Sequence, residues 1–138
     1  MTIDLTEMEQ RVLAELEECG EQNIFAMLNT IIDPTGDAAE VISLRQAVQA
    51  LVERDYVIMG LEGFAPRDPE ELGKTASLEL LSKLDNWFRF DAADPHWTLS
   101  TGDIKKERIP AVYSTDAGHQ KAVEILTQRG YQWWRPKK

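Results

Sequence analysis

Four polar side chains in one short stretch have the chemistry to read the edges of nucleic-acid bases. The stretch SLRQAVQALVERDYVIMG covers residues 43–60, and these side chains are Ser43, Arg45, Gln46 and Gln49. Arginine pairs well with guanine, glutamine with adenine, and serine with a base or a phosphate. Nearer the C-terminus, a short basic group could contact phosphates: Lys105, Lys106 and Arg108. The alternative is that both groups only face solvent.

Side chains that commonly carry catalysis are scattered along the chain. His96 and His119 are far apart in sequence and lack the spacing of a metal site. Cys19 is the only cysteine, which excludes an intramolecular disulfide, fits a reducing cytoplasm and favours a buried thiol over a nucleophile. No carboxylate pair stands out as an acid/base couple, and residues 60–63 lack the pattern of a phosphate-binding loop. We therefore expect no catalytic residue, no metal and no cofactor.

Composition indicates one globular domain with an uneven charge. The chain has 138 residues, of which 43% are hydrophobic and 28% charged, and its net charge is −9. The sequence shows neither a long apolar run nor a secretory signal, so we expect a cytoplasmic protein without membrane contact. Residues 1–40 carry −9, residues 41–60 are neutral, and residues 101–138 carry +4. A local basic face is therefore compatible with the acidic total.

The first half of the chain predicts three helices and a strand. Thr6 and Glu9 form a capping box for the first helix, whose five glutamates are expected to be a solvated face. A second helix covers residues 24–32 and ends at a proline–glycine turn. Residues 37–42 are either a separate helical piece or the start of the next helix, for which Ser43 and Gln46 form another capping box. A strand follows at residues 56–59.

The second half predicts an insertion, two strands and a final helix. Asp68 and Pro69 indicate the start of a helix that continues to residue 84, and residues 87–90 are its end or a short strand. Residues 96–100 and 109–114 are predicted to be strands around a turn at 101–103, and Pro110 favours an edge position. Thr115 caps the last helix and Gly130 ends it.

Seven aromatic residues of the second half stand out: Trp87, Phe88, Phe90, Trp97, Tyr131, Trp133 and Trp134. Their default role is a second small core between the insertion and the C-terminal tail. The alternative is that some of them form a self-association or partner surface. The candidates for such an interface are Tyr131, Trp133 and Trp134.

Two segments resemble winged helix–turn–helix regulators of the MarR or PadR type. Residues 44–57, LRQAVQALVERDYV, are similar to the reading helix that leads into the first wing strand. Residues 112–118, VYSTDAG, are similar to the strand, threonine and glycine that enter a closing helix. Together with the two preceding helices, the resemblance covers residues 5–60 and 96–130. It implies an α+β winged helix–turn–helix fold with a helical insertion in the wing region and a C-terminal helix.

The predicted domain therefore comprises residues 1–138, with residues 61–95 inserted into its core. The resemblance implies a dimeric transcription regulator that binds double-stranded DNA through Ser43, Arg45, Gln46, Gln49 and the basic group. A winged-helix module that binds a protein partner and no DNA is the alternative, because one fold supports many functions. A small enzyme or ligand-binding protein with a pocket beside the insertion is a third class.

Overall fold

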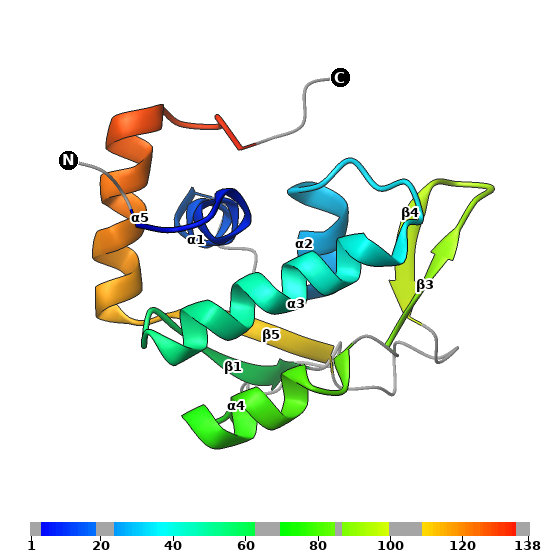
Figure 1. Ribbon diagram of the computed structural model, residues 1–138, viewed down its shortest axis with the longest axis horizontal. Coiled ribbons are helices and arrows are strands. Elements are labelled where there is room, and N and C mark those ends of the chain that lie inside the picture. The colour runs from blue at the N-terminus through cyan, green and yellow to red at the C-terminus, as the bar shows by residue number, and fades with distance from the viewer. Residues whose placement is uncertain (1–3, 19–23, 63–69, 85–86, 100–108, 135–138) are drawn as a thin grey trace.

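The computed structural model describes residues 4–18, 24–62, 70–84, 87–99 and 109–134, which form an α+β fold. Five helices lie within them: α1 (Glu7–Glu18), α2 (Ile24–Thr30), α3 (Ala38–Glu53), α4 (Lys74–Leu81) and α5 (Asp116–Arg129). The strands are β1 (Val57–Glu62), β2 (Glu70–Glu71), β3 (Phe88–Asp91), β4 (His96–Leu99) and β5 (Ile109–Ser114). Helix α3 crosses the middle of the molecule between α1 and α2 on one side and α4 on the other, and α5 packs beside α1 (Figure 1).

Helix α1 starts with the predicted capping box. The Glu9 backbone N–H donates to Thr6 Oγ1 at 3.2 Å, and the Thr6 backbone N–H donates to the Glu9 carboxylate at 3.4 Å. This reciprocal pair satisfies polar groups that a helix start leaves without an intrahelical partner. The prediction for the start of α1 is therefore confirmed.

Helix α3 starts earlier than Ser43. Asp37 is the N-cap, because its carboxylate accepts from the Ala39 N–H at 2.9 Å. Residues 37–42 are therefore the start of this helix and not a separate piece. The predicted Ser43–Gln46 capping box is wrong, and Ser43 is an exposed residue inside the helix. Asp37 and Glu40 have the same capping spacing, and nothing between them and Ser43 breaks a helix.

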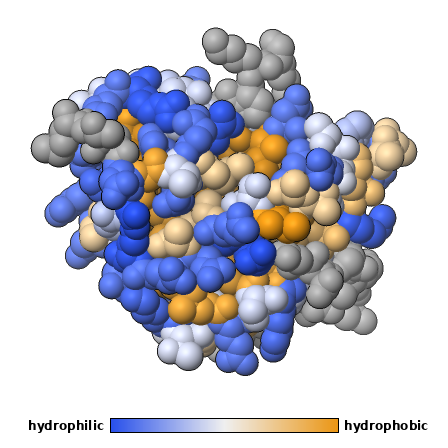
Figure 2. Space-filling model, viewed as in Figure 1, coloured by the Kyte–Doolittle hydropathy of each residue, from blue (hydrophilic) through white to orange (hydrophobic). Residues whose placement is uncertain are grey.

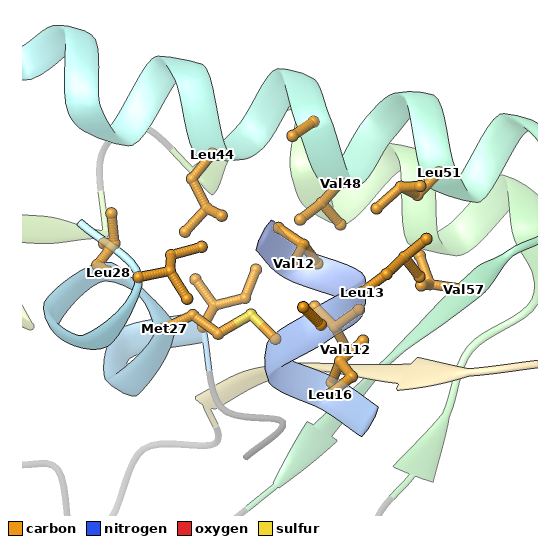
Figure 3. Close-up of a cluster of buried hydrophobic side chains, with 14 of the residues drawn as sticks. Val12, Leu13, Leu16, Met27, Leu28, Leu44, Val48, Leu51, Val57 and Val112 are labelled. Atoms are coloured by element: carbon orange, nitrogen blue, oxygen red, sulfur yellow. The ribbon is translucent and has the colours of Figure 1, made fainter. Parts of the chain in front are cut away.

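A continuous hydrophobic cluster holds the inner side of α3. Figure 3 shows Leu44, Val48 and Leu51 of α3 pointing towards side chains of α1, α2 and the sheet. All three are fully buried. Because each buried aliphatic side chain stabilises the fold by about 1.5–3 kcal/mol, this contact determines which side of α3 faces the core.

The main sheet has three antiparallel strands in the order β2-β1-β5. Strand β1 pairs with β5 over its whole length, from Val57 opposite Ser114 to Glu62 opposite Ile109. Strand β4 pairs with β3 instead, in a separate two-stranded sheet. The predicted pairing of residues 96–100 with 109–114 is therefore wrong, and its turn at 101–103 lies outside the described residues. Pro110 does lie in an edge strand, as predicted.

The insertion contains a short strand and a short helix where one longer helix was predicted. Residues 70–71 form β2 and pair with residues 60–61 of β1, and α4 starts at Lys74. The Ser77 hydroxyl accepts from the Met59 N–H at 3.2 Å, so α4 is fixed to β1. The predicted cap, Asp68 with Pro69, lies outside the described residues.

The β3–β4 hairpin packs against α2 and the start of α3. Of residues 87–90, Phe88 to Phe90 thus belong to a strand, the second of the two predicted alternatives. Asn29 donates to the Trp97 carbonyl at 2.9 Å and accepts from its N–H at 2.7 Å, and the Trp97 indole donates to Glu40 at 3.2 Å. The predicted boundary after residue 95 divides this hairpin.

The expected second aromatic core is wrong, because Phe88, Trp97 and Trp134 belong to the main hydrophobic cluster.

Helix α5 starts and ends at the predicted residues. Thr115 Oγ1 accepts from the Gly118 N–H at 3.1 Å, and Gly130 ends the helix with a φ of 92°. The Thr115 hydroxyl also lies 2.6 Å from the Asp55 carbonyl oxygen, so the cap joins α5 to the turn after α3. Among the described residues, no helix is both long and apolar enough to cross a bilayer.

Candidate functional site

The outward side of α3 carries all four predicted base-reading side chains. Ser43 and Gln46 are exposed, and Arg45 and Gln49 are half-buried. Their direction follows from the burial of the opposite side of α3 in the core (Figure 3). A helix with one side fixed in a core presents its other side to solvent. The structure therefore brings these four residues together on one surface, which we call the α3 surface.

Two side chains of the α3 surface, Arg45 and Gln49, form a line of hydrogen bonds with the neighbouring Glu53. Arg45 Nη1 donates to Gln49 Oε1 at 3.4 Å, and Gln49 Nε2 donates to Glu53 Oε1 at 3.4 Å. Both pairs have the i,i+4 spacing that places side chains next to each other on a helix. A shallow hollow of about 280 Å³ lies beside this line, and its lining also includes Gln46 and Ala50.

Acidic side chains border the α3 surface at both of its ends, Glu40 at the start of α3 and Glu53 at its end. At the start of α3, the Glu40 carboxylate accepts from the N–H groups of Thr35 and Gly36 at 3.0 and 3.1 Å. At the end, Lys74 donates to the Glu53 carbonyl at 3.0 Å and pairs with Asp55 at 3.3 Å. Residues 41–52 contain no acid and one base, Arg45. Figure 2 shows hydrophilic side chains mixed with smaller apolar areas on the face that carries α3.

The three C-terminal aromatic residues differ in exposure. Tyr131 is 72% exposed, Trp133 is half-buried and Trp134 is fully buried. Trp134 Nε1 donates to Glu18 at 2.7 Å, and the Arg129 guanidinium carbon lies 3.4 Å from the centroid of the Trp133 ring. Trp134 is therefore part of the core, and Tyr131 alone among the three has a largely exposed ring.

The glutamates of α1 do not form the solvated face that their sequence pattern predicted. Two of them, Glu9 and Glu15, are almost completely buried. The other three contact α5 or the segment after it, in the pairs Glu7–Arg129, Glu17–His119 and Glu18–Trp134. These partners follow their glutamates by more than 100 residues. No local pattern could therefore have identified these contacts.

The ion pair between Glu7 and Arg129 shifts the pKa of the Glu7 carboxyl. Arg129 Nη1 lies 2.8 Å from Glu7 Oε2, and Arg11 Nε lies 3.5 Å from Glu7 Oε1. The hydrogen bond from Arg129 lowers the pKa of the Glu7 carboxyl below its usual value, and the charges of both arginines add to this effect. This ion pair links the start of α1 to the end of α5.

Neither of the two histidines belongs to a group of described side chains suited to a metal ion. His96 lies on β4 beside Asp94, and His119 lies on α5 beside Glu17. In the part of the chain that the structure describes, no three histidine, cysteine or carboxylate side chains form a group suited to a metal ion. Cys19, Lys105, Lys106 and Arg108 lie outside the described residues.

Comparison with known proteins found no match for this chain. No family model, no curated protein and no solved structure matches the chain. A functional conclusion therefore depends on the geometry and chemistry of the α3 surface.

Proposed function

We propose that this is a DNA-binding, transcription-regulatory protein without catalytic activity, and that α3 is its reading helix. In this proposal α1, α2, α3, β1, β5 and α5 form a winged helix, with α3 in the major groove and the strands beside the DNA backbone. The chain order supports this interpretation, with three helices and β1 first, then β2, α4, β3 and β4, and finally the antiparallel partner strand β5 and the closing helix α5.

The observation that carries the proposal is the chemistry of the α3 surface. It presents an arginine, two glutamines and a serine, which are the side-chain types that recognise base edges. The Glu40 carboxylate at the start of α3 accepts from backbone N–H groups, and the Glu53 carboxylate at its end accepts from Gln49. The surface therefore has polar groups that match bases, and its one internal charge is positive.

The direct test is the salt dependence of binding to a random-sequence duplex. Fluorescence anisotropy of a labelled 24-base-pair duplex should show binding that weakens steeply between 50 and about 200 mM salt. Arg45→Ala should weaken binding by roughly tenfold, whereas Arg89→Ala is the matched control on the exposed side of β3. The double variant Lys105→Ala/Lys106→Ala should reduce the slope of log K against log salt by about 2.

A protein-interaction module is the second candidate, and one observation favours it. Ile42 on α3 is 37% exposed, and Ala38 and Ala39 beside it are exposed as well. These apolar side chains lie at the start of α3 near acidic Asp37, which is a poor neighbour for phosphate groups. Absence of salt-dependent binding to any duplex at 50 mM salt would overturn the DNA proposal and favour this second candidate.

We also propose that the protein acts as a homodimer. Val123 on α5 and Tyr131 just after it are 42% and 72% exposed, and such apolar side chains are suited to a subunit contact. Sedimentation velocity of the full chain at micromolar concentration tests this proposal. Val123→Glu should convert a dimer to a monomer, and a wild-type protein that sediments as a monomer would refute dimerisation.

A further inference from the structure

We propose that the start of α3 reads thymine, through contact of Ile42 with the 5-methyl group of the base in the major groove. This inference rests on the proposed DNA-binding function and deepens it, because it names a base that is selected and the residue that selects it. The substrate class is duplex DNA with a thymine where the start of α3 enters the groove. Ile42 is thus a specificity-determining residue whose contact is apolar.

Ile42 exposes apolar surface on a helix whose opposite side is fixed in the core. Its side chain is 37% exposed, whereas the nearby Val41 and Leu44 are 4% and 0% exposed. Rotation of α3 that buried Ile42 would expose these two side chains, so the helix keeps its direction. Ala38 and Ala39, one turn earlier, are exposed as well. We call Ala38, Ala39 and Ile42 the apolar end of α3, and a ligand that covers it gains hydrophobic free energy.

The place of the apolar end in the helix decides what it contacts in a groove. A reading helix touches base edges mainly with the residues near its N-terminus, and in α3 these residues include the apolar end. None of its three side chains can donate or accept a hydrogen bond. Among the groups that base edges present in the major groove, the apolar one is the C5 methyl of thymine. The apolar end therefore matches thymine better than any other base.

The acids beside the apolar end are bonded to groups of the protein itself. The Asp37 carboxylate accepts from the Ala39 N–H at 2.9 Å, and the Glu40 carboxylate accepts from the Trp97 indole at 3.2 Å. Residues 41–52, which follow, contain no acid and one base. Local charge on this part of α3 is therefore compatible with a polyanion, although the whole chain is acidic. This favours duplex DNA as the occupant of the apolar end.

The size of the expected effect follows from a single methyl group. Burial of one such group against an apolar side chain changes an equilibrium constant by about fourfold. Deoxyuridine differs from thymidine only by this methyl, and its hydrogen-bonding groups in the major groove are the same. Replacement of thymidine with deoxyuridine thus tests the apolar contact and leaves every polar contact of the base in place.

Two variants of Ile42 form a matched pair. Ile42→Val keeps an apolar, β-branched side chain, and Ile42→Asn replaces it with a polar one. Valine and asparagine are both shorter than isoleucine and have similar helix propensities, so the two variants differ mainly in polarity. Circular dichroism checks the fold of each variant. If Ile42→Asn does not fold, Ile42→Ala takes its place, because alanine has the highest helix propensity and removes the contact beyond Cβ.

The experiment first identifies the preferred duplex and then removes its methyl groups one at a time. Wild-type protein is selected on a random-sequence duplex library, and fluorescence anisotropy measures binding to the selected duplex with each thymidine in turn replaced by deoxyuridine. We expect at least one replacement to weaken wild-type binding by about three- to fivefold. The same replacement should weaken binding of Ile42→Val by about two- to fourfold, and binding of Ile42→Asn by less than about 1.5-fold.

Two results would overturn the inference and leave the proposed function intact. In the first, no deoxyuridine replacement changes wild-type binding, a measurement that needs no variant to fold. In the second, the sensitive position is equally sensitive in Ile42→Asn or Ile42→Ala, so that another side chain contacts the methyl group. In both cases the protein still binds DNA. If no duplex is bound at all, the proposed function fails and the inference fails with it.

Discussion

Replacing Gly118 with alanine should destabilise the protein, although alanine normally stabilises a helix. Gly118 lies in the first turn of α5, where an added Cβ would be 1.9 Å from the Tyr56 carbonyl oxygen. This oxygen also accepts hydrogen bonds from the N–H and the hydroxyl of Thr115, at 3.0 and 3.1 Å. The added methyl group therefore requires α5 to move away from the turn that follows α3, and this movement breaks the contacts of Thr115.

The expected loss follows from three opposing contributions. Alanine in a helix is favoured over glycine by about 0.5–1 kcal/mol. Against this, overpacking typically costs about 1–3 kcal/mol, and loss of a threonine cap costs about 1 kcal/mol. We therefore expect the free energy of unfolding of Gly118→Ala to fall by about 1–3.5 kcal/mol. The Tm should fall by roughly 3–17 °C in a domain of this size.

Urea denaturation followed by circular dichroism measures this loss, and Gly73→Ala is the matched control. Gly73 precedes α4, its φ is −68°, and no atom lies within 4 Å of an added Cβ. Gly73→Ala should change the free energy of unfolding by less than about 1 kcal/mol. A Gly118→Ala protein as stable as the wild type would refute the close contact between α5 and Tyr56.

Three further predictions concern other contacts of the fold. Trp134→Ala should lower the free energy of unfolding by about 3–5 kcal/mol in urea denaturation, because its ring is fully buried and donates to Glu18; a loss below 1 kcal/mol would contradict the core position. Asp37→Ala should cost about 1 kcal/mol in the same assay through loss of the α3 cap, and an unchanged stability would contradict that cap. The lowered pKa of Glu7 means that its pair with Arg129 stabilises the protein above the usual pKa and is lost as the pH falls through the folded value. The wild type should therefore exceed Glu7→Gln in stability by up to about 1 kcal/mol at pH 6, and this difference should shrink as the pH falls below the usual pKa of glutamate, whereas a constant difference would contradict this linkage.

The net charge of −9 disfavours long-range attraction between this protein and DNA, which the proposed function must accommodate. Three of the α1 glutamates contact α5 or the segment after it, and two more are buried, so these acids are not displayed on the α3 surface. The overall charge still repels phosphate at long range. We therefore expect weak binding to nonspecific duplex, and a larger contribution from base contacts than in a basic DNA-binding protein.

The sequence by itself determined the type of most elements and several of their ends. Helical spacing of apolar residues identified α1, α2, α3 and α5, and β-branched residues identified β1 and β5. Caps at Thr6, Thr115 and Gly130 were predicted correctly, because a cap depends on residues within one helical turn. The outward position of Arg45, Gln46 and Gln49 followed from the same periodicity.

Tertiary structure decided which strands pair and what the charged residues contact. Alternating apolar residues show that a segment is a strand, but they do not name its partner, so the pairing of β5 with β1 and of β4 with β3 was not predictable locally. The partners of Glu17 and Glu18 are equally distant in sequence. The line of hydrogen bonds from Arg45 through Gln49 to Glu53 was predictable only in part. Its spacing and outward direction are visible in the sequence, but only the tertiary structure shows the hydrogen bonds and the hollow beside them.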